Sequence, residues 1–434
     1  MPRPGVFTGR STGWLSVANT FDTVLGSDAR ILADADFRLL LLANSTQALG
    51  SALVSPLLTS LTGPYGVPAT EIGLMMSVFT APAILVIPLL GALIDRYGRK
   101  PVLVPALCLF GVSGTALAFT TDFAVVLALR SLQGLGFAGI LPVVITSIGD
   151  LYDGGEEATG QGLRFAVSGL SQAVFPIVGG GLVVLAWQYP FLLYALAIPV
   201  ALLVYARFED PHTAGSTDPG TDGKTDTRGT LGELYELATH THVAAILLAR
   251  GLPVIAWLGF FTYNSVLVVR VLDGTPQGAG VLVAAGSVAY AGAASQAGRL
   301  TTALGGRAVV LYGANLVLAG GIGLLAAAPS FPIAGLGVVL TGVGFGVAMS
   351  LYRSLVTGFA PGPLRGKLVS LGEAGGRITA TLTPIGMGVV IAGVEPIVGF
   401  AGAVRWAFVL IGAIGGLGGV VCVRLASRAA GSSL

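Results

Sequence analysis

Long apolar stretches alternate with short polar segments along most of the chain. A helix that crosses the hydrocarbon core of a bilayer, about 30 Å thick, needs about 20 mainly apolar residues. Twelve stretches of this chain meet that requirement. They are residues 38–62, 71–91, 101–120, 123–148, 161–186, 189–206, 243–269, 278–298, 307–327, 331–358, 367–392 and 404–424. We therefore predict an all-α membrane protein with twelve transmembrane helices.

One long polar interruption divides these stretches six and six. It begins with Glu209-Asp210-Pro211 and continues with a stretch rich in Gly, Thr and Asp, which cannot bury much apolar surface. We therefore expect a flexible linker here. The predicted organisation is a tail (1–36), a six-helix bundle (37–207), a cytoplasmic linker (208–242), a second six-helix bundle (243–428) and a short tail (429–434).

Basic residues gather in the loops on one side of the predicted helices, and an excess of Lys and Arg marks cytoplasmic loops. The loops after the second, eighth and tenth stretches contain Arg96, Arg99, Lys100, Arg299, Arg307, Arg365 and Lys367. The loops after the odd-numbered stretches contain at most one each. We predict a multi-pass protein of the plasma membrane with both termini in the cytoplasm. Residues 1–36 lack a long apolar run, so we expect no cleaved signal peptide.

The composition supports a membrane protein. Hydrophobic residues make up 54% of the chain and charged residues 10%, whereas a soluble domain has about 25% charged residues. The net charge of +2 offers no basic surface for nucleic acid. Cys108 and Cys422 lie in apolar stretches, and the three histidines lie in or beside the linker. We expect no disulfide, metal or cofactor, and the lipid bilayer as the surrounding partner of a monomer.

The two predicted bundles share glycine patterns at a constant spacing. The segments Gly91–Lys100 and Gly298–Arg307 match at four positions with an offset of 207 residues. Gly134-x-Gly136 in the fourth stretch recurs as Gly342-x-Gly344 in the tenth, with an offset of 208. These matches predict two pseudo-symmetric bundles, and repeated halves around a midplane site are typical of secondary transporters.

Four motifs resemble those of a known family, the major facilitator superfamily. They are Gly91-x-Leu93-x-Asp95-Arg96-x-Gly98-Arg99-Lys100 after the second stretch, Arg130-x-x-Gln133-Gly134-x-Gly136 in the fourth, Pro176-x-x-Gly179-Gly180 in the fifth, and Ala360-Pro361 followed by Arg365-Gly366. The resemblance covers about residues 37–428 and implies the twelve-helix fold of that family. The Pro176 motif resembles that of its drug–proton antiporter branch, although Phe175 stands where that branch usually has glycine.

Charged side chains inside hydrocarbon are costly, so those within the apolar stretches need a reason. Glu373 is the one acidic residue well inside a predicted helix, and Arg377 lies one turn further along the same face. Either Glu373 takes up and releases protons as it separates from Arg377, or the two form a permanent ion pair. A third interpretation is that Glu373 reaches the cytoplasmic surface.

Three arginines also lie within apolar stretches: Arg130, Arg164 and Arg250. Arg130 has Gln133 on a neighbouring face. The resemblance implies that Arg130 binds a polar or anionic substrate group or supports proton transfer; the alternative is that it binds backbone carbonyls and fixes helix packing. Arg250 precedes Pro253, at an expected helix break, and lies either in a cavity or near the inner interface.

Polar side chains avoid lipid and therefore indicate which helices line a cavity. The candidates for the substrate or proton pathway outside the charged residues are Asn44, Gln47, Gln172, Trp257, Phe261 and Asn264. The last three recur at helical spacing, and their face suits an aromatic or amphipathic ligand. A plain packing stripe fits the same spacing.

The loop after the second stretch is a candidate cytoplasmic gate, formed by Gly91, Asp95, Arg96, Gly98, Arg99 and Asp150. The resemblance implies that Asp95 faces the start of the eleventh helix, where a helix N-terminus favours negative charge. Arg99 is then expected to pair with Asp150. Alternatively, the basic residues only set the topology.

Proline and adjacent glycines are expected to bend two of the helices, which suits helices that must rock. These residues are Pro176, Gly179, Gly180 and Pro384.

These features favour a secondary transporter that moves a small solute by rocker-switch alternating access. Within that class we favour proton-coupled efflux of amphipathic or hydrophobic compounds. The alternatives are a nutrient or metabolite symporter or facilitator and, in another class, a membrane sensor or scaffold that binds a ligand without moving it. We find no nucleophile–base constellation in the sequence and do not expect an enzyme.

Overall fold

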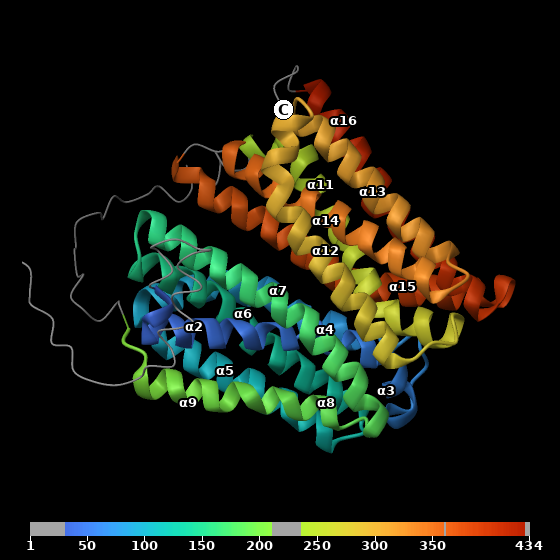
Figure 1. Ribbon diagram of the computed structural model, residues 1–434, viewed down its shortest axis with the longest axis horizontal. Helices are drawn as coiled ribbons and strands as arrows, with labels where there is room; N and C mark the ends of the chain where they lie inside the picture. Colours follow the sequence, from blue (N-terminus) through green and yellow to red (C-terminus); the bar gives the residue numbers. More distant parts are fainter. Residues whose placement is uncertain (1–30, 211–235, 360–361, 430–434) are drawn as a thin grey trace, which may run out of the picture.

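The computed structural model describes residues 31–210, 236–359 and 362–429, apart from some side chains within two helices. These residues form two helical bundles that meet along one side (Figure 1). The N-terminal bundle contains α2 (Ala35–Thr46), η2 (Gln47–Leu49), η3 (Ser55–Leu57), α3 (Leu58–Tyr65), α4 (Leu74–Tyr97), α5 (Lys100–Ala116), η4 (Leu117–Phe119), α6 (Phe123–Leu151), α7 (Gly154–Leu185), α8 (Tyr189–Leu192), η5 (Leu193–Leu196) and α9 (Ala197–Arg207).

The C-terminal bundle follows the linker, most of which (211–235) lies outside the described residues. It contains α11 (Thr241–Val266), the π-helical turn η7 (Leu267–Val271), α12 (Pro276–Ala303), α13 (Arg307–Ala327), α14 (Phe331–Phe359), α15 (Gly362–Gly412), the π-helical turn η8 (Ala413–Leu417) and α16 (Gly418–Ala429). Helix α15 bends at Gly399, whose φ of 75° is open to glycine and strained for other residues.

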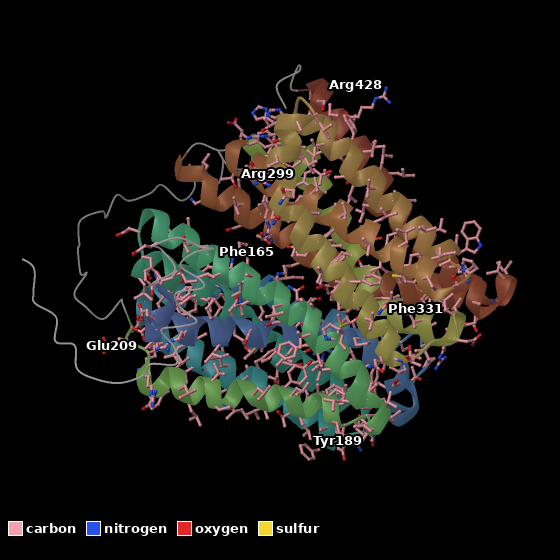
Figure 2. All side chains as sticks on the ribbon, in the orientation of Figure 1. Phe165, Tyr189, Glu209, Arg299, Phe331 and Arg428 are labelled. Atoms are coloured by element: carbon pink, nitrogen blue, oxygen red, sulfur yellow. The ribbon has the colours of Figure 1, made fainter. Side chains whose placement is uncertain are left out.

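Two ends of the bundles can be distinguished. We call the helix ends near Arg99, Asp150 and Arg299 the inner ends, and the opposite ends the outer ends. Figure 2 marks Glu209, Arg299 and Arg428 at inner ends and Tyr189 and Phe331 at outer ends.

The first predicted span is not one continuous helix. Helix α2 ends at Thr46, and a 3-10 turn, a short irregular stretch and a second 3-10 turn lead into α3. Near the break, Ser45 and Thr46 donate side-chain hydrogen bonds to the carbonyls of Leu42 and Ala43. Such local bonds compete with the helix ladder, and they leave carbonyl groups in the break that need another donor.

Nine helical segments of the described residues are long and apolar enough to cross a membrane. The last of them, Lys367–Ala429, contains both the eleventh and the twelfth predicted stretches. The first predicted span is missing from the nine because it is broken, and only a shorter apolar helix, Leu74–Val86, represents the second. The fold is therefore that of an all-α membrane protein, and the number twelve stays a prediction.

The predicted repeat is confirmed in three dimensions by its glycines. A Cβ added to Gly136 in α6 would lie 2.6 Å from the carbonyl oxygen of Ala106 in α5. A Cβ added to Gly344 in α14 would lie 2.6 Å from the carbonyl oxygen of Ala314 in α13. Both members of this contact recur 208 residues later, so the two bundles pack equivalent helices in the same way.

Candidate functional site

Arg130 is fully buried in α6 and supports the break in the first span. Its Nε donates to the carbonyl of Met75 (3.1 Å), its Nη2 to that of Gly50 (3.0 Å) and its Nη1 to Oε1 of Gln133 (2.6 Å). The guanidinium also lies 4.2 Å from the centre of the Phe79 ring. This is the packing arrangement that the sequence left open as an alternative: the break supplies the carbonyl of Gly50, and the first turn of α4 supplies that of Met75.

Glu373 forms its ion pair with Arg250 rather than with Arg377 as the sequence suggested. The carboxylate of Glu373 in α15 turns toward α11, where Nη2 of Arg250 donates to it. Arg353 of α14 approaches the same oxygen with its Nε at 3.8 Å. The side chain of Glu373 is 45% exposed and that of Arg250 only 3% exposed. The pair therefore joins a buried cation to an accessible carboxylate.

Arg377 and Arg164 extend this charged group between the two bundles. The guanidinium of Arg377 lies 5.8 Å from the centre of the Phe137 ring of the other bundle. Arg164 is buried in α7, donates to Gln161 at 2.9 Å and is repelled by the charge of Arg353. Arg164, Arg250 and Glu373 each lie about 15 Å along their helices from the inner end, which is about a third of the length of each helix when α15 is counted to its bend.

The polar residues predicted on the first and fifth spans lie near Arg164. Nδ2 of Asn44 donates to the carbonyl of Arg164 (3.1 Å) and to the hydroxyl of Ser168 (2.8 Å), so it ties α2 to α7. Gln47 opens η2 and Gln172 lies on α7, and both are partly buried. The structure thus brings Asn44 close to the charged group through a buried contact.

Trp257, Phe261 and Asn264 are buried in α11, in agreement with a packing stripe. Asn264 donates to the carbonyl of Ala279 in α12 at 2.8 Å. Trp257 stacks on Phe345 with ring centres 4.9 Å apart, and Tyr290 lies 5.4 Å from the same ring. Tyr290 also interacts electrostatically with Arg164. The aromatic group therefore adjoins the charged group through Tyr290.

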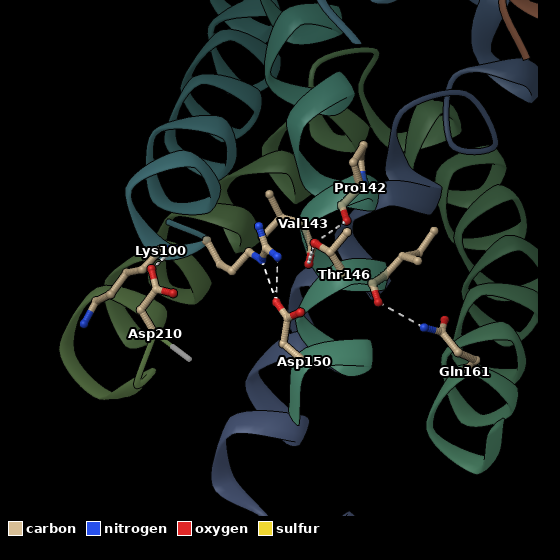
Figure 3. Close-up of polar contacts among 9 residues, drawn as sticks. Lys100, Pro142, Val143, Thr146, Asp150, Gln161 and Asp210 are labelled. Carbon is tan, nitrogen blue, oxygen red and sulfur yellow. Dashed lines mark hydrogen bonds and ion pairs between the residues drawn. The ribbon is translucent and has the colours of Figure 1, made fainter. Parts of the chain in front are cut away.

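At the inner ends of the N-terminal bundle, the expected pair between Arg99 and Asp150 is present, with Nη2 2.7 Å from Oδ2 (Figure 3). It joins the start of α5 to the end of α6 within one bundle. The backbone N–H of Lys100 donates to Asp210 at 2.9 Å, which fixes the start of the linker here. Gly98 has a φ of 92°, and a Cβ there would lie 2.6 Å from the Asp210 carboxylate.

The other predicted gate residues give less information. Arg96 is exposed, with its guanidinium 5.3 Å from the centre of the Tyr97 ring. The surroundings of Gly91 and the side chain of Asp95 lie outside the described part of the structure. The same holds for residues 360–361, which precede the eleventh predicted stretch.

The glycines of the fifth span serve close packing. A Cβ on Gly179 would lie 2.6 Å from the side chain of Leu53, and one on Gly180 would lie 2.6 Å from the carbonyl of Pro276 in α12. Helix α7 runs unbroken through Pro176. Pro384 is likewise inside α15, and its carbonyl accepts a hydrogen bond from Tyr263 at 3.3 Å. Bending at these prolines stays a prediction.

Polar contacts close the outer side between the bundles. Ser55 donates to the carbonyl of Phe261, the hydroxyls of Thr59 and Ser265 lie 3.0 Å apart, and Arg270 donates to Thr62 at 2.9 Å. Deeper in the interface, the hydroxyls of Thr80 and Thr381 lie 3.0 Å apart. Apart from that of Thr80, the hydroxyl groups on the N-terminal side of this interface come from η3 and α3, the second half of the broken first span.

A pocket with a volume of about 270 Å³ lies elsewhere, among α11, α15 and η8. It is lined by Ile255, Leu382, Met387, Leu410 and other apolar side chains. Leu382 is 58% exposed on the outer surface of the bundle, so this pocket faces the surroundings rather than the charged group.

Sequence reasoning missed Arg353 and the outer contacts, whereas Tyr290 is one of the polar residues of the eighth stretch that the sequence places along a cavity. Arg353 lies inside the tenth predicted stretch, and the rule that singled out Arg130 and Arg250 applies to it equally. No comparable pattern identifies Thr59 and Ser265, because their contact depends on how α3 packs against α11.

Family models match much of the chain. The model described as Major Facilitator Superfamily matches residues 40–272, and one described as MFS/sugar transport protein matches residues 186–360.

Among curated relatives, the Bacillibactin exporter of Bacillus subtilis (strain 168) is 35% identical over 150 residues, which is 33% of this chain and 37% of that protein. The Quinolone resistance protein NorA of Staphylococcus aureus is 26% identical over 164 residues, or 38% and 42% of the two chains. The matched part thus spans well under two thirds of these relatives.

Solved structures share the fold over nearly the whole chain. A bacterial homologue of the human lysosomal transporter Spinster, in an inward-facing and unoccupied conformation, has a TM-score of 0.78 at 15% identity and covers 97% of this chain and 98% of that one. The D-xylose–proton symporter has a TM-score of 0.71 at 16% identity and covers 90% and 96%.

Proposed function

This chain belongs to the major facilitator superfamily, and from that premise we propose that it exports small amphipathic compounds in exchange for protons. The curated relatives include an exporter and a drug-resistance protein, which supports the direction of transport. One observation carries the proton coupling. Glu373 is an accessible carboxylate, about 15 Å along its helix from the inner end, whose partner Arg250 belongs to another helix.

Alternating access needs a closed side and a side that admits the solute. The contacts of Ser55, Thr59 and Thr62 with η7 and the end of α11 close the outer side. The solute then enters from the inner side, toward Glu373 and Arg353. Opening of the outer side requires that these contacts separate while the inner ends approach each other.

Glu373 couples this movement to protons in our proposal. In the state seen here, Glu373 accepts a hydrogen bond from Arg250 and so joins α15 to α11. Once the outer contacts have separated, a proton that arrives from the outer side neutralises the carboxylate and removes its attraction to Arg250. The helices then rearrange, and the proton leaves to the inner side as the ion pair forms again.

The orientation follows from the basic loops. We assign the inner ends, which carry Arg99, Lys100 and Arg299, to the cytoplasm, in accordance with the distribution of Lys and Arg. The protein then acts as a monomer in the plasma membrane, with its linker in the cytoplasm.

Transport in proteoliposomes tests the proposal. A panel of fluorescent amphipathic solutes, including a quinolone, is followed under an imposed pH gradient, together with the internal pH. We expect solute and proton to move in opposite directions, and Glu373→Gln to abolish the dependence on the gradient. Glu395→Gln, on the exposed outer part of the same helix, is the matched control and should leave it intact. Movement of proton and solute in the same direction would show a symporter instead.

A further inference from the structure

Positive charge exceeds negative charge where the two bundles face each other. We call Arg164, Arg250, Arg353 and Arg377 the arginine cluster: the first interacts with Arg353, and the other three interact with the carboxylate of Glu373. Arg353 repels each of the other three guanidinium groups, and Glu373 attracts Arg250 and Arg377. Four guanidinium groups against one carboxylate leave three positive charges in excess within the described residues.

Burial makes this excess costly. Arg164 is 5% and Arg250 is 3% exposed; Arg250 shares its one counter-charge, Glu373, with Arg353 and Arg377, and no acidic side chain among the described residues pairs with Arg164. Within the described part of the chain, Nη1 of Arg250 is buried and has no hydrogen-bond acceptor. The arginine cluster therefore has positive charge that Glu373 does not neutralise and a hydrogen-bond donor that Glu373 does not occupy. An anion supplied from outside the protein satisfies both.

Aromatic rings adjoin the cluster on both bundles. Arg377 lies over Phe137 of α6, and Phe137 packs on Phe79 with ring centres 4.9 Å apart. On the other bundle, Tyr290 interacts with Arg164 and packs against Phe345. A ligand at the cluster thus meets fixed cations and planar apolar surfaces together.

We propose that the transported solute is an amphipathic organic anion whose oxyanion group binds Arg250 and Arg353 in place of Glu373. This inference rests on the proposed transport function and names its substrate class. Guanidinium groups bind planar oxyanions through paired, charge-assisted hydrogen bonds. When the solute displaces the Glu373 carboxylate from Arg250, that carboxylate pairs with Arg377, which lies one helical turn away on the same helix. The apolar body of the solute lies against Phe137 and Tyr290.

The excess positive charge also predicts which solutes the site prefers. A cationic solute of the same shape meets three uncompensated positive charges, and repulsion between like charges excludes wrong partners effectively. A neutral solute finds the aromatic surfaces but leaves the Arg250 donor unused. The order of affinity is therefore anion, neutral compound, cation.

Three matched probes test this order: 1-naphthoate, 1-naphthamide and 1-naphthylmethylamine, which share the ring and differ in charge. Binding to the full chain is measured by equilibrium dialysis in nanodiscs of phosphatidylcholine, a lipid without net charge. We expect naphthoate to bind at least about ten-fold more tightly than the amide, as one charge-assisted hydrogen bond implies, and the amine most weakly.

Substitutions test whether the arginine cluster causes the preference for naphthoate. Arg353 is half exposed, so Arg353→Gln should fold, and it should reduce naphthoate affinity to about the level of the amide. Arg353→Lys should retain part of the preference. Arg299→Gln, the same change at an exposed arginine outside the cluster, should retain all of it. A wild-type protein that does not prefer naphthoate, or an unchanged preference in Arg353→Gln, would overturn the proposal.

The test separates this inference from the transport function. Flux of a neutral amphipathic solute in proteoliposomes, without preference for naphthoate in binding, would refute the anion assignment and leave the exporter intact. A clear preference for naphthoate without flux of any solute would refute the transport function and leave the anion site standing.

Discussion

Gly280 of α12 packs directly against the backbone of Pro176 of α7, so that a Cβ on Gly280 would overlap the Pro176 carbonyl oxygen. The contact is reciprocal, because Gly180 meets Pro276 one turn away. These backbones belong to different bundles. The glycines thus set how closely the bundles approach each other on the outer side.

We expect Gly280→Val to force this contact apart and to abolish transport while the bundles stay folded. Overpacking of this kind costs about 1–3 kcal/mol. Gly292→Val is the control on the same helix, since a Cβ there meets nothing within 4 Å. Flux in proteoliposomes and thermal unfolding in detergent are compared. Full transport by Gly280→Val would show that the close approach is unnecessary.

Arg130 is expected to act mainly through stability. Arg130→Met removes the donor to the carbonyl of Gly50 in the helix break, and a buried carbonyl without a partner costs about 1–3 kcal/mol. The variant should therefore unfold at a markedly lower temperature than Arg299→Met, in which an exposed arginine is replaced. An unchanged unfolding temperature together with lost transport would instead place Arg130 in the substrate or proton pathway.

The Arg99–Asp150 pair should hold the inner ends of α5 and α6 together. Asp150→Asn leaves Arg99 without this charge partner, and we expect more rapid amide hydrogen exchange at both helix ends. The double exchange Arg99→Asp with Asp150→Arg should restore part of the protection. The same exchange rates in wild type and Asp150→Asn would contradict a structural role for the pair.

Tyr152 predicts a pH effect at the inner face. Burial, and then the hydrogen bond to Asp34 at 2.5 Å, raise the pKa of the Tyr152 phenol above its ordinary value. Because the folded pKa is raised, the stability that this group contributes is present below about pH 10 and is lost as the pH rises further. Tyr152→Phe should therefore lose less stability than wild type between about pH 8 and about pH 11 in thermal unfolding. An equal loss in both proteins would contradict the assignment.

The sequence predicts the helical architecture well, because hydrocarbon thickness sets the length of each apolar stretch. It also predicts the repeat through Gly136 and Gly344, and the pair between Arg99 and Asp150. It does not predict the break after Thr46, since an apolar stretch of the right length does not reveal whether its backbone is continuous.

The candidate site is harder to predict for a physical reason. Helical spacing places Arg377 beside Glu373, but only the packing of α15 on α11 shows that Arg250 reaches the carboxylate first. In the same way, Arg130 appears as an available cation in the sequence, whereas it binds the carbonyl of Gly50 in a distant helix break and that of Met75 in α4. Partners on other helices decide the role of each charge.

Alternating access itself is tested most directly by a cross-link on the outer side. The hydroxyls of Thr59 and Ser265 lie 3.0 Å apart and belong to different bundles. We expect a disulfide between Thr59→Cys and Ser265→Cys to hold the outer side closed, and therefore to block solute flux in proteoliposomes until a reductant is added. Each single cysteine variant should transport normally. Undiminished flux through the fully cross-linked protein would contradict the account, because the solute would then cross without separation of the outer ends.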